Sequence, residues 1–292
     1  MLRDSIRRIV LGILAASPLA ASPPAALPLA ALTLTVLSLS ATGARAADDQ
    51  ITRGKYLVTI GICGSCHTPN LAGGRKVGNL VSANITSDSA SGLGGWSEQQ
   101  IVEALRNGKR PDGSDVRPPM GVFFYRGLSD TDAHAIAAYL RQVPAVATSF
   151  QRAPVSGPPP KFGAIVSSVP DAPHSDKLAY GRYVAVTVSH CMQCHTPRVG
   201  GLPDLERMGA GGNGYTGADG RTAVSANITP GNPGGIAGWT DAQVKRAITK
   251  GVRPDGSKLV PVMDFDFYEQ MTPEDLDALV GFLRSLKPVP PA

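Results

Sequence analysis

The sequence predicts an all-α, loop-rich protein that contains two versions of one helical unit. Residues 51–146 form the first repeat and residues 175–292 the second, because short motifs recur in the same order in both. The Ser-Ala-Asn-Ile-Thr sequence of residues 82–86 returns at 225–229, and Gly-Trp and Arg-Pro-Asp-Gly motifs follow at the same separation of 143 positions. Capping residues place helices between the motifs, and 33 glycines with 25 prolines indicate long loops.

Three helices are expected in each repeat. The first carries a Gly-x-Tyr sequence and leads into a pair of cysteines. The middle helix begins at a capping box and ends at a glycine, Gly108 or Gly251. The last begins at Ser129 in the first repeat and at Thr272 in the second, where Pro273 occupies the first turn and its missing N–H does no harm. The two capping boxes are Ser97 with Gln100 and Thr240 with Gln243.

Composition divides the chain into four segments. Residues 1–46 have the features of an export signal, residues 47–146 form a first domain, and residues 175–292 form a second. Residues 147–174 are rich in Pro, Ser and Gly and predict a semi-rigid linker. Aromatic residues make up only 5% of the chain, so the core needs something besides side chains to fill it.

The predicted signal has a positively charged start, apolar runs and an Ala-x-Ala cleavage site at residues 44–46. An uncleaved membrane anchor is the alternative, but prolines interrupt the apolar stretch, which favours cleavage and a periplasmic location. The net charge of +5 falls to +2 without this segment, because it holds four basic residues and one acidic residue. Such a balance gives no indication of nucleic-acid binding.

A Cys-x-x-Cys-His pentapeptide occurs once in each repeat and uses all four cysteines of the chain. This spacing attaches a c-type haem, since two thiols form thioethers to one haem edge and the following His binds the iron. A zinc site would need two more ligands nearby, and a thiol redox pair does not need the His. The candidate haem-binding residues are Cys63, Cys66, His67, Cys191, Cys194 and His195.

Met120 and Met263 are the candidate sixth ligands of the two irons. They are 143 positions apart, like the motifs around them, and an aromatic pair follows each at the same distance. Methionine often fills cores, but a Met sulfur on iron raises the reduction potential and suits electron transfer, whereas an open face would permit chemistry on peroxide. His134 and His190 are weaker candidates, because His134 aligns with an Asp and His190 immediately precedes a haem cysteine.

These motifs together resemble the multihaem cytochrome c subunits of bacterial periplasmic dehydrogenases, of which the alcohol dehydrogenase subunit is the best-known example. The resemblance covers nearly all of the chain after residue 46. It implies two tandem class I cytochrome c domains, with one covalently attached haem c in each. Members with three such units exist, whereas we expect two units here and no C-terminal anchor.

The resemblance also implies roles for other residues. Gly54 should let the first helix cross closely against Tyr139 on the last helix, and Gly181 should do the same against Phe282. Two Asn–Trp pairs should lie near the haem propionates, although the Trp residues could equally be ordinary core residues. Two arginines could pair with propionates or could be solvated turn residues. These residues are Asn84, Trp96 and Arg110 in the first repeat and Asn227, Trp239 and Arg253 in the second.

The predicted function is electron transfer in the periplasm without catalytic residues. A dehydrogenase subunit would donate electrons, and an oxidase, a quinone-linked complex or a small carrier would accept them. A dihaem cytochrome c peroxidase is the enzyme alternative, and it requires one iron with a vacant or displaceable face. A free tandem cytochrome that shuttles between complexes shares the same chemistry and differs only in its partner.

Overall fold

The computed structural model describes residues 29–290 except 79, 151–156, 159, 218–219 and 233–234, with the backbone alone for residues 29–44. It divides into two units, residues 1–44 and residues 45–292, and both repeats lie in the second unit. Helix α1 (Leu29–Ile60) begins in the first unit and ends immediately before the first cysteine pair. It therefore includes the predicted cleavage site, and most of the predicted signal lies outside the described residues. None of the described helices is both long and apolar enough to span a membrane.

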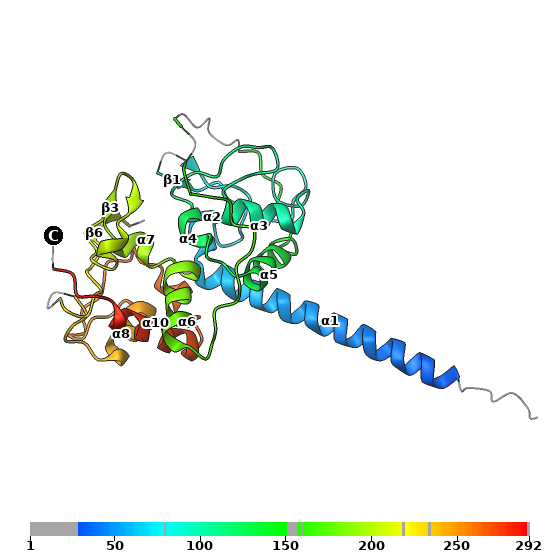
Figure 1. Cartoon of the computed structure of the whole chain (residues 1–292). Coiled ribbons are helices and arrows are strands. Elements are labelled where there is room, and N and C mark those ends of the chain that lie inside the picture. Colours follow the sequence, from blue (N-terminus) through cyan, green and yellow to red (C-terminus); the bar gives the residue numbers. More distant parts are fainter. Residues whose placement is uncertain are drawn as a thin grey trace, which may run out of the picture. The chain divides into compact units, whose positions relative to one another are not determined.

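The first repeat consists of short helices joined by loops (Figure 1). After the end of α1 come α2 (Cys63–His67), α3 (Glu98–Arg106), α4 (Val122–Tyr125) and α5 (Asp130–Leu140). A small antiparallel hairpin, β1 (Lys76–Val77) with β2 (Leu80–Val81), lies between α2 and α3. Helix α3 packs on α5 and α4, and the apolar side chains of these helices form the core of the repeat.

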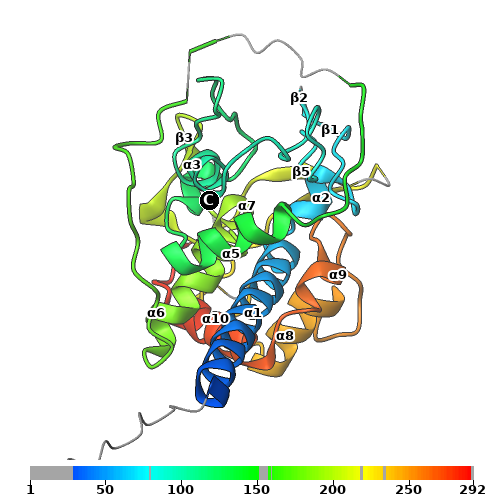
Figure 2. The ribbon, with the colours of Figure 1, turned by 90° about the vertical axis from the view of Figure 1, so that its right-hand side faces the viewer.

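The second repeat has the same order of helices with additions (Figure 2). Its helices are α6 (Lys177–Arg182), α7 (Met192–His195), α8 (Asp241–Lys250), α9 (Phe265–Tyr268) and α10 (Pro273–Ser285). The Ser-Ala-Asn-Ile-Thr motifs are 143 positions apart but the cysteine pairs only 128, so the second repeat has a Gly-rich insertion of 15 residues within residues 199–222. This region adds the hairpin β3 (Arg198–Val199) with β4 (Leu202–Pro203) and the 3₁₀ turn η2 (Leu205–Arg207). Strands β5 (Gly214–Thr216) and β6 (Thr222–Val224) form a third hairpin. The described part is thus mainly helical with three two-stranded hairpins, which the all-α prediction did not include.

The predicted helix caps are confirmed. The Ser97 and Thr240 side chains accept the N–H of Gln100 and Gln243, and both capping boxes are complete. Ser129 and Thr272 cap α5 and α10 in the same way. Helix α8 ends at Gly251, whose φ of 61° is a conformation that glycine adopts without steric cost.

The first and last helices of each repeat cross in backbone contact, as predicted. A Cβ added to Gly54 would lie 1.9 Å from the Ala135 carbonyl oxygen, and one added to Gly181 would lie 1.9 Å from that of Ala278. The next neighbours of these two glycines include Cβ of Tyr139 and Cβ of Phe282 respectively. Only glycine fits such a crossing, because any larger residue would push the helices apart.

The described part of the predicted linker is attached to the first repeat. The Asn107 side chain donates to the carbonyl of Val166 at 3.0 Å and accepts its N–H at 2.9 Å. Asp130 accepts the hydroxyl of Ser168 at 2.6 Å and the N–H of Val169 at 3.1 Å. Residues 166–169 are therefore held by side chains of α5 and of the end of α3.

The second repeat departs from the first in one helix. Helix α6 continues as a π-helix, η1 (Tyr183–Val188), whereas the equivalent turn of α1 is α-helical. The Gly-x-Tyr motifs are 127 positions apart, but the cysteine pairs that follow are 128 apart, so the second repeat has one extra residue here. A π-helix accommodates one extra residue while the chain beyond keeps its place.

Candidate haem sites

The two Cys-x-x-Cys-His motifs are short helical segments at the ends of longer helices. Helix α2 includes all of the first motif, while α7 includes the second except Cys191, which lies at its N-cap. No disulfide joins the four cysteines, and all four are half-buried. Burial raises the pKa of Cys63 and of Cys191 to about 12, with the nearby second cysteine of each motif as a smaller cause. These thiols are therefore neutral at physiological pH.

The histidine of each motif is locked in one tautomer. His67 Nδ1 lies 2.7 Å from the Ala83 carbonyl oxygen, and His195 Nδ1 lies 2.8 Å from that of Ala226. A carbonyl can only accept, so Nδ1 of the neutral ring carries the proton and Nε2 keeps its lone pair for a metal. Burial also lowers the pKa of both imidazoles, although the carbonyl contact acts against this. Both rings are therefore held neutral, with Nε2 free of the carbonyl contact.

These residues fit a haem better than a bare metal ion. No group of three or more His, Cys, Asp and Glu side chains gathers as a metal site anywhere in the described part of the chain. A haem brings four nitrogen ligands of its own, so one imidazole and one further ligand complete its iron. The paired thiols and the Nδ1-protonated imidazole are the donors that a c-type haem needs.

The Ser-Ala-Asn-Ile-Thr motif holds the carbonyl that fixes the histidine. Asn84 is 3% exposed, and its Oδ1 accepts the N–H of Thr86 at 2.9 Å and its hydroxyl at 2.7 Å. Its Nδ2 donates to the Val146 carbonyl at 2.7 Å. Asn227 has the same arrangement with Thr229 and with the carbonyl of Val289. Both asparagines therefore brace their loops through all of their polar atoms, and their expected place near the propionates stays a prediction.

The two arginines of the Arg-Pro-Asp-Gly motifs hold their own turns. Arg110 donates to the Ser114 hydroxyl at 3.3 Å and also to the Asp115 carbonyl. Arg253 donates to the Ser257 hydroxyl at 3.3 Å and to the Lys258 carbonyl at 3.0 Å. These contacts favour the turn interpretation over propionate pairing. Both Trp residues are half-buried against the core.

Met120 and Met263 occupy equivalent loops. Each lies two residues before a four-residue helix, α4 or α9, and the carbonyl of each accepts the N–H two residues later at 2.9 Å. Both side chains are half-buried and pack against the hydrophobic core. Ligation of iron by these sulfurs stays a prediction. His134 lies on the surface beside Glu98 at 3.6 Å, and His190 lies 3.2 Å from the Gly61 carbonyl and edge-on to Tyr125.

The two repeats exchange equivalent tyrosine–aspartate contacts. Tyr56 of the first repeat donates to Asp275 of the second at 2.5 Å, and Tyr183 of the second donates to Asp132 of the first at 2.7 Å. Each hydroxyl also accepts the N–H of the residue that caps the opposite last helix, Thr272 or Ser129. The carboxylates lie in the first turns of α10 and α5, where the helix dipole favours negative charge.

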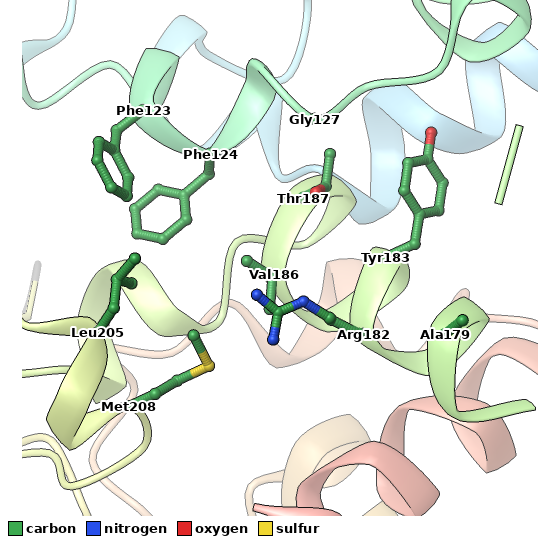
Figure 3. A pocket seen from close by; sticks show the side chains of 10 residues that line it. All are labelled: Phe123, Phe124, Gly127, Ala179, Arg182, Tyr183, Val186, Thr187, Leu205 and Met208. Carbon is green, nitrogen blue, oxygen red and sulfur yellow. The ribbon is translucent and has the colours of Figure 1, made fainter. Parts of the chain in front are cut away.

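A cavity of about 320 Å³ lies elsewhere between the repeats (Figure 3). Phe123 and Phe124 of α4 face Leu205 and Met208 of the insertion across it, with Arg182 on the side of the second repeat. None of the predicted haem-binding residues is among its lining residues. The cavity is thus separate from the motifs that hold the haem donors.

The sequence did not identify the residues that orient the donors. Ala83 and Ala226 act through their carbonyls, so their side chains carry no chemical indication of that role. Asn213 also helps to hold the second motif in place, because its Nδ2 donates to the carbonyls of Cys194 at 2.8 Å and of Thr196 at 2.7 Å. For Ala83 and Ala226, the available signal was that Ala recurs at the same place in both Ser-Ala-Asn-Ile-Thr motifs.

Comparisons with known proteins identify a cytochrome c domain in the first repeat and related cytochrome subunits. Residues 51–144 match the cytochrome c family. The chain is 30% identical to the fructose dehydrogenase cytochrome subunit of Gluconobacter japonicus, over 84% of this chain and 54% of that protein. It is 28% identical to the cytochrome c subunit of the quinone alcohol dehydrogenase of Gluconobacter oxydans, over 86% of this chain and 58% of that protein.

A shorter relative is covered more fully. The chain is 27% identical to a diheme cytochrome c-type protein of Cereibacter sphaeroides, over 80% of this chain and 85% of that protein. By contrast, the chain spans little more than half of the length of the two dehydrogenase subunits. A cytochrome c domain carries covalently bound haem c. Residues 51–144 therefore form a cytochrome c domain, within a chain that is similar to the cytochrome c subunits of dehydrogenases.

Proposed function

We propose that this protein is an electron carrier with two covalently attached haems c, one in each of two tandem class I cytochrome c domains. The observation that carries the proposal is the repetition of the histidine lock, in which each Nδ1 is bound to the alanine carbonyl of the same motif. Both repeats thus prepare a neutral imidazole beside a thiol pair. The second motif would have no reason to keep this geometry if only the first held a haem.

The chain's own residues would hold each haem. Cys63 and Cys66 would form the thioethers of the first haem, and His67 and Met120 would ligate its iron. Cys191, Cys194, His195 and Met263 would do the same in the second repeat. Haem iron, when bound, supplies a one-electron couple between its ferrous and ferric states. Two protein ligands on each iron leave no vacant face, which favours electron transfer over the peroxidase alternative.

The partners follow from the relatives. Two of them are described as cytochrome subunits of a fructose and of an alcohol dehydrogenase, so we propose a dehydrogenase as the electron donor of this chain. An oxidase, a quinone-linked complex or a small carrier would accept the electrons. Haem attachment to Cys-x-x-Cys-His and the predicted signal at residues 1–46 place the protein in the periplasm in this proposal.

Haem content is the first test. The full chain would be produced with haem c maturation, denatured and weighed, and we expect a mass that corresponds to two covalently attached haems. Replacing Cys63 and Cys66 by Ala should remove one haem, and replacing Cys191 and Cys194 should remove the other. Loss of haem on denaturation, or a single haem in the unaltered chain, would defeat the proposal.

The spin state is the second test. With His and Met on both irons, the oxidised protein should be low-spin at both haems and should turn over hydrogen peroxide negligibly. A high-spin haem that appears after uptake of one electron, together with peroxide turnover, would support the dihaem peroxidase instead.

A further inference from the structure

The third residue of each Cys-x-x-Cys-His motif reaches the opposite repeat. Gln193, which precedes Cys194, donates from its side-chain Nε2 to the carbonyl of Pro119 at 2.8 Å. Pro119 immediately precedes Met120. On the other side of this methionine, a Cβ added to Gly121 would lie 3.0 Å from Gln193 Oε1. The Gln193 amide therefore contacts the residues on both sides of Met120.

The first motif makes the corresponding contact with the second repeat. Ser65 occupies the position equivalent to Gln193, and its side chain lies close to Asp264, the residue that follows Met263. Burial raises the pKa of the Asp264 carboxyl, and the Ser65 side chain is near enough to act against that rise. The ring of Phe267, farther along the same loop, lies 3.1 Å from the position that a Cβ on Gly64 would take. The Met263 loop thus packs on the first motif, as the Met120 loop does on the second.

Both methionine loops are turns that lead into very short helices. Met120 donates its N–H to the Arg117 carbonyl at 3.2 Å, and α4, which begins two residues later, is a single turn. Helix α9 is equally short. The position of such a loop depends in part on what it packs against, and here that surface is the cysteine motif of the opposite repeat.

We propose that Gln193 and Ser65 are positioning residues for the methionine of the opposite repeat. Gln193 holds the loop that presents Met120, and Ser65 holds the loop that presents Met263. This inference rests on the proposed His/Met coordination of both irons. It predicts a crosswise effect, because removing either side chain disturbs the methionine of the repeat to which that side chain does not belong.

The experiment uses the full holoprotein with both haems. Met120→Ala and Met263→Ala first assign the Met–iron charge-transfer band and the reduction potential of each haem. Gln193→Leu, which keeps most of the side-chain volume and removes the amide, should then weaken the band and lower the potential assigned to Met120, while those assigned to Met263 stay unchanged. Ser65→Ala should do the reverse.

The matched control is Tyr215→Phe. The Tyr215 hydroxyl donates to the backbone carbonyl of Gln193 at 3.4 Å from within the second repeat, so its loss touches the same motif without a contact across the repeats. We expect this variant to leave the haem assigned to Met120 unchanged.

Two results would overturn the inference in distinguishable ways. If Gln193→Leu altered only the haem of its own repeat, or both haems equally, the crosswise role would be wrong and the coordination would stand. If Met120→Ala altered neither spectrum nor potential, the coordination itself would fail and the inference with it. Ser65→Ala gives an independent answer should Gln193→Leu not accumulate as holoprotein.

Discussion

Single residues at the haem sites act mainly through the backbone around them. His67 is oriented by the carbonyl of Ala83, and the loop that carries this carbonyl is held by Asn84. The Asn84 side chain thus supports the position of His67 indirectly, through the backbone. Sequence motifs identify which residues are important here, while only the structure shows whether a side chain or a backbone carbonyl makes the contact.

Replacing Met120 by Ala should leave haem attachment intact, because the thioethers and the histidine do not depend on the sulfur. One haem should lose its Met–iron charge-transfer band, and its potential should fall by more than about 59 mV, the change that corresponds to a factor of ten for a one-electron couple. Spectroelectrochemical titration measures both. Met271→Leu is the control, since Met271 is a buried core residue at the start of α10 and a volume-conserving change should shift neither haem. Unchanged spectra and potentials in Met120→Ala would make His134 the ligand to test.

Helices and their ends were the most predictable elements. The capping residues of α3, α5, α8 and α10 are local signals, since a hydroxyl and an N–H three residues later need no distant partner. The π-helix η1 was not predicted, although the change in motif separation from 127 to 128 positions already required one extra residue there. The sequence does not show how a helix accommodates an extra residue, because an unwound helix end or a surface loop would give the same separation between the motifs.

The helix crossing at Gly54 should tolerate no side chain. Gly54→Ala places a methyl group 1.9 Å from the Ala135 carbonyl oxygen, so the helices must move apart at a cost of about 1–3 kcal/mol in unfolding free energy. Denaturant titration of the holoprotein measures this loss. Gly281→Ala in α10 is the matched control, because no atom lies within 4 Å of its added Cβ and alanine favours the helix by about 0.5–1 kcal/mol. Equal effects of the two substitutions on the unfolding free energy would show that the close helix crossing does not require glycine at position 54.

At the scale of the whole molecule, the contacts between repeats were invisible in the sequence. Tyr56 and Asp275 are 219 positions apart, and each belongs to a motif that already had an explanation within its own repeat. The same holds for Tyr183 and Asp132. Motif repetition predicts that two similar units exist, but which faces meet depends on side chains that have no local periodic signal.

The contact of Tyr56 with Asp275 should lose its stabilising effect in alkali. Burial, followed by the hydrogen bond to Asp275, raises the pKa of Tyr56 to about 12 from an ordinary value of 10.0. The neutral phenol is the form that folding favours, so its contribution is complete below pH 10 and is lost as the pH rises through about 12. We expect Tyr56→Phe to cost about 1 kcal/mol at neutral pH, with a difference from the unaltered protein that shrinks between pH 10 and 12. Denaturant titrations at several pH values measure it, and Tyr183→Phe should behave alike.

A difference between unaltered and Tyr56→Phe protein that stays constant up to pH 12 would contradict this assignment. It would mean that the cost of the substitution does not depend on the ionisation of the Tyr56 hydroxyl.

The exchange of equivalent tyrosine–aspartate contacts has the form of an isologous interface, in which one surface patch meets a second copy of itself. Each repeat carries both a tyrosine donor and an aspartate acceptor. Two separate copies of one such unit could therefore form both hydrogen bonds without a connecting peptide. Duplication and fusion of one gene for a self-pairing ancestor would produce such a molecule directly. In that history the two sites began identical, and the extra residue of η1 and the insertion after the second motif are among the later changes.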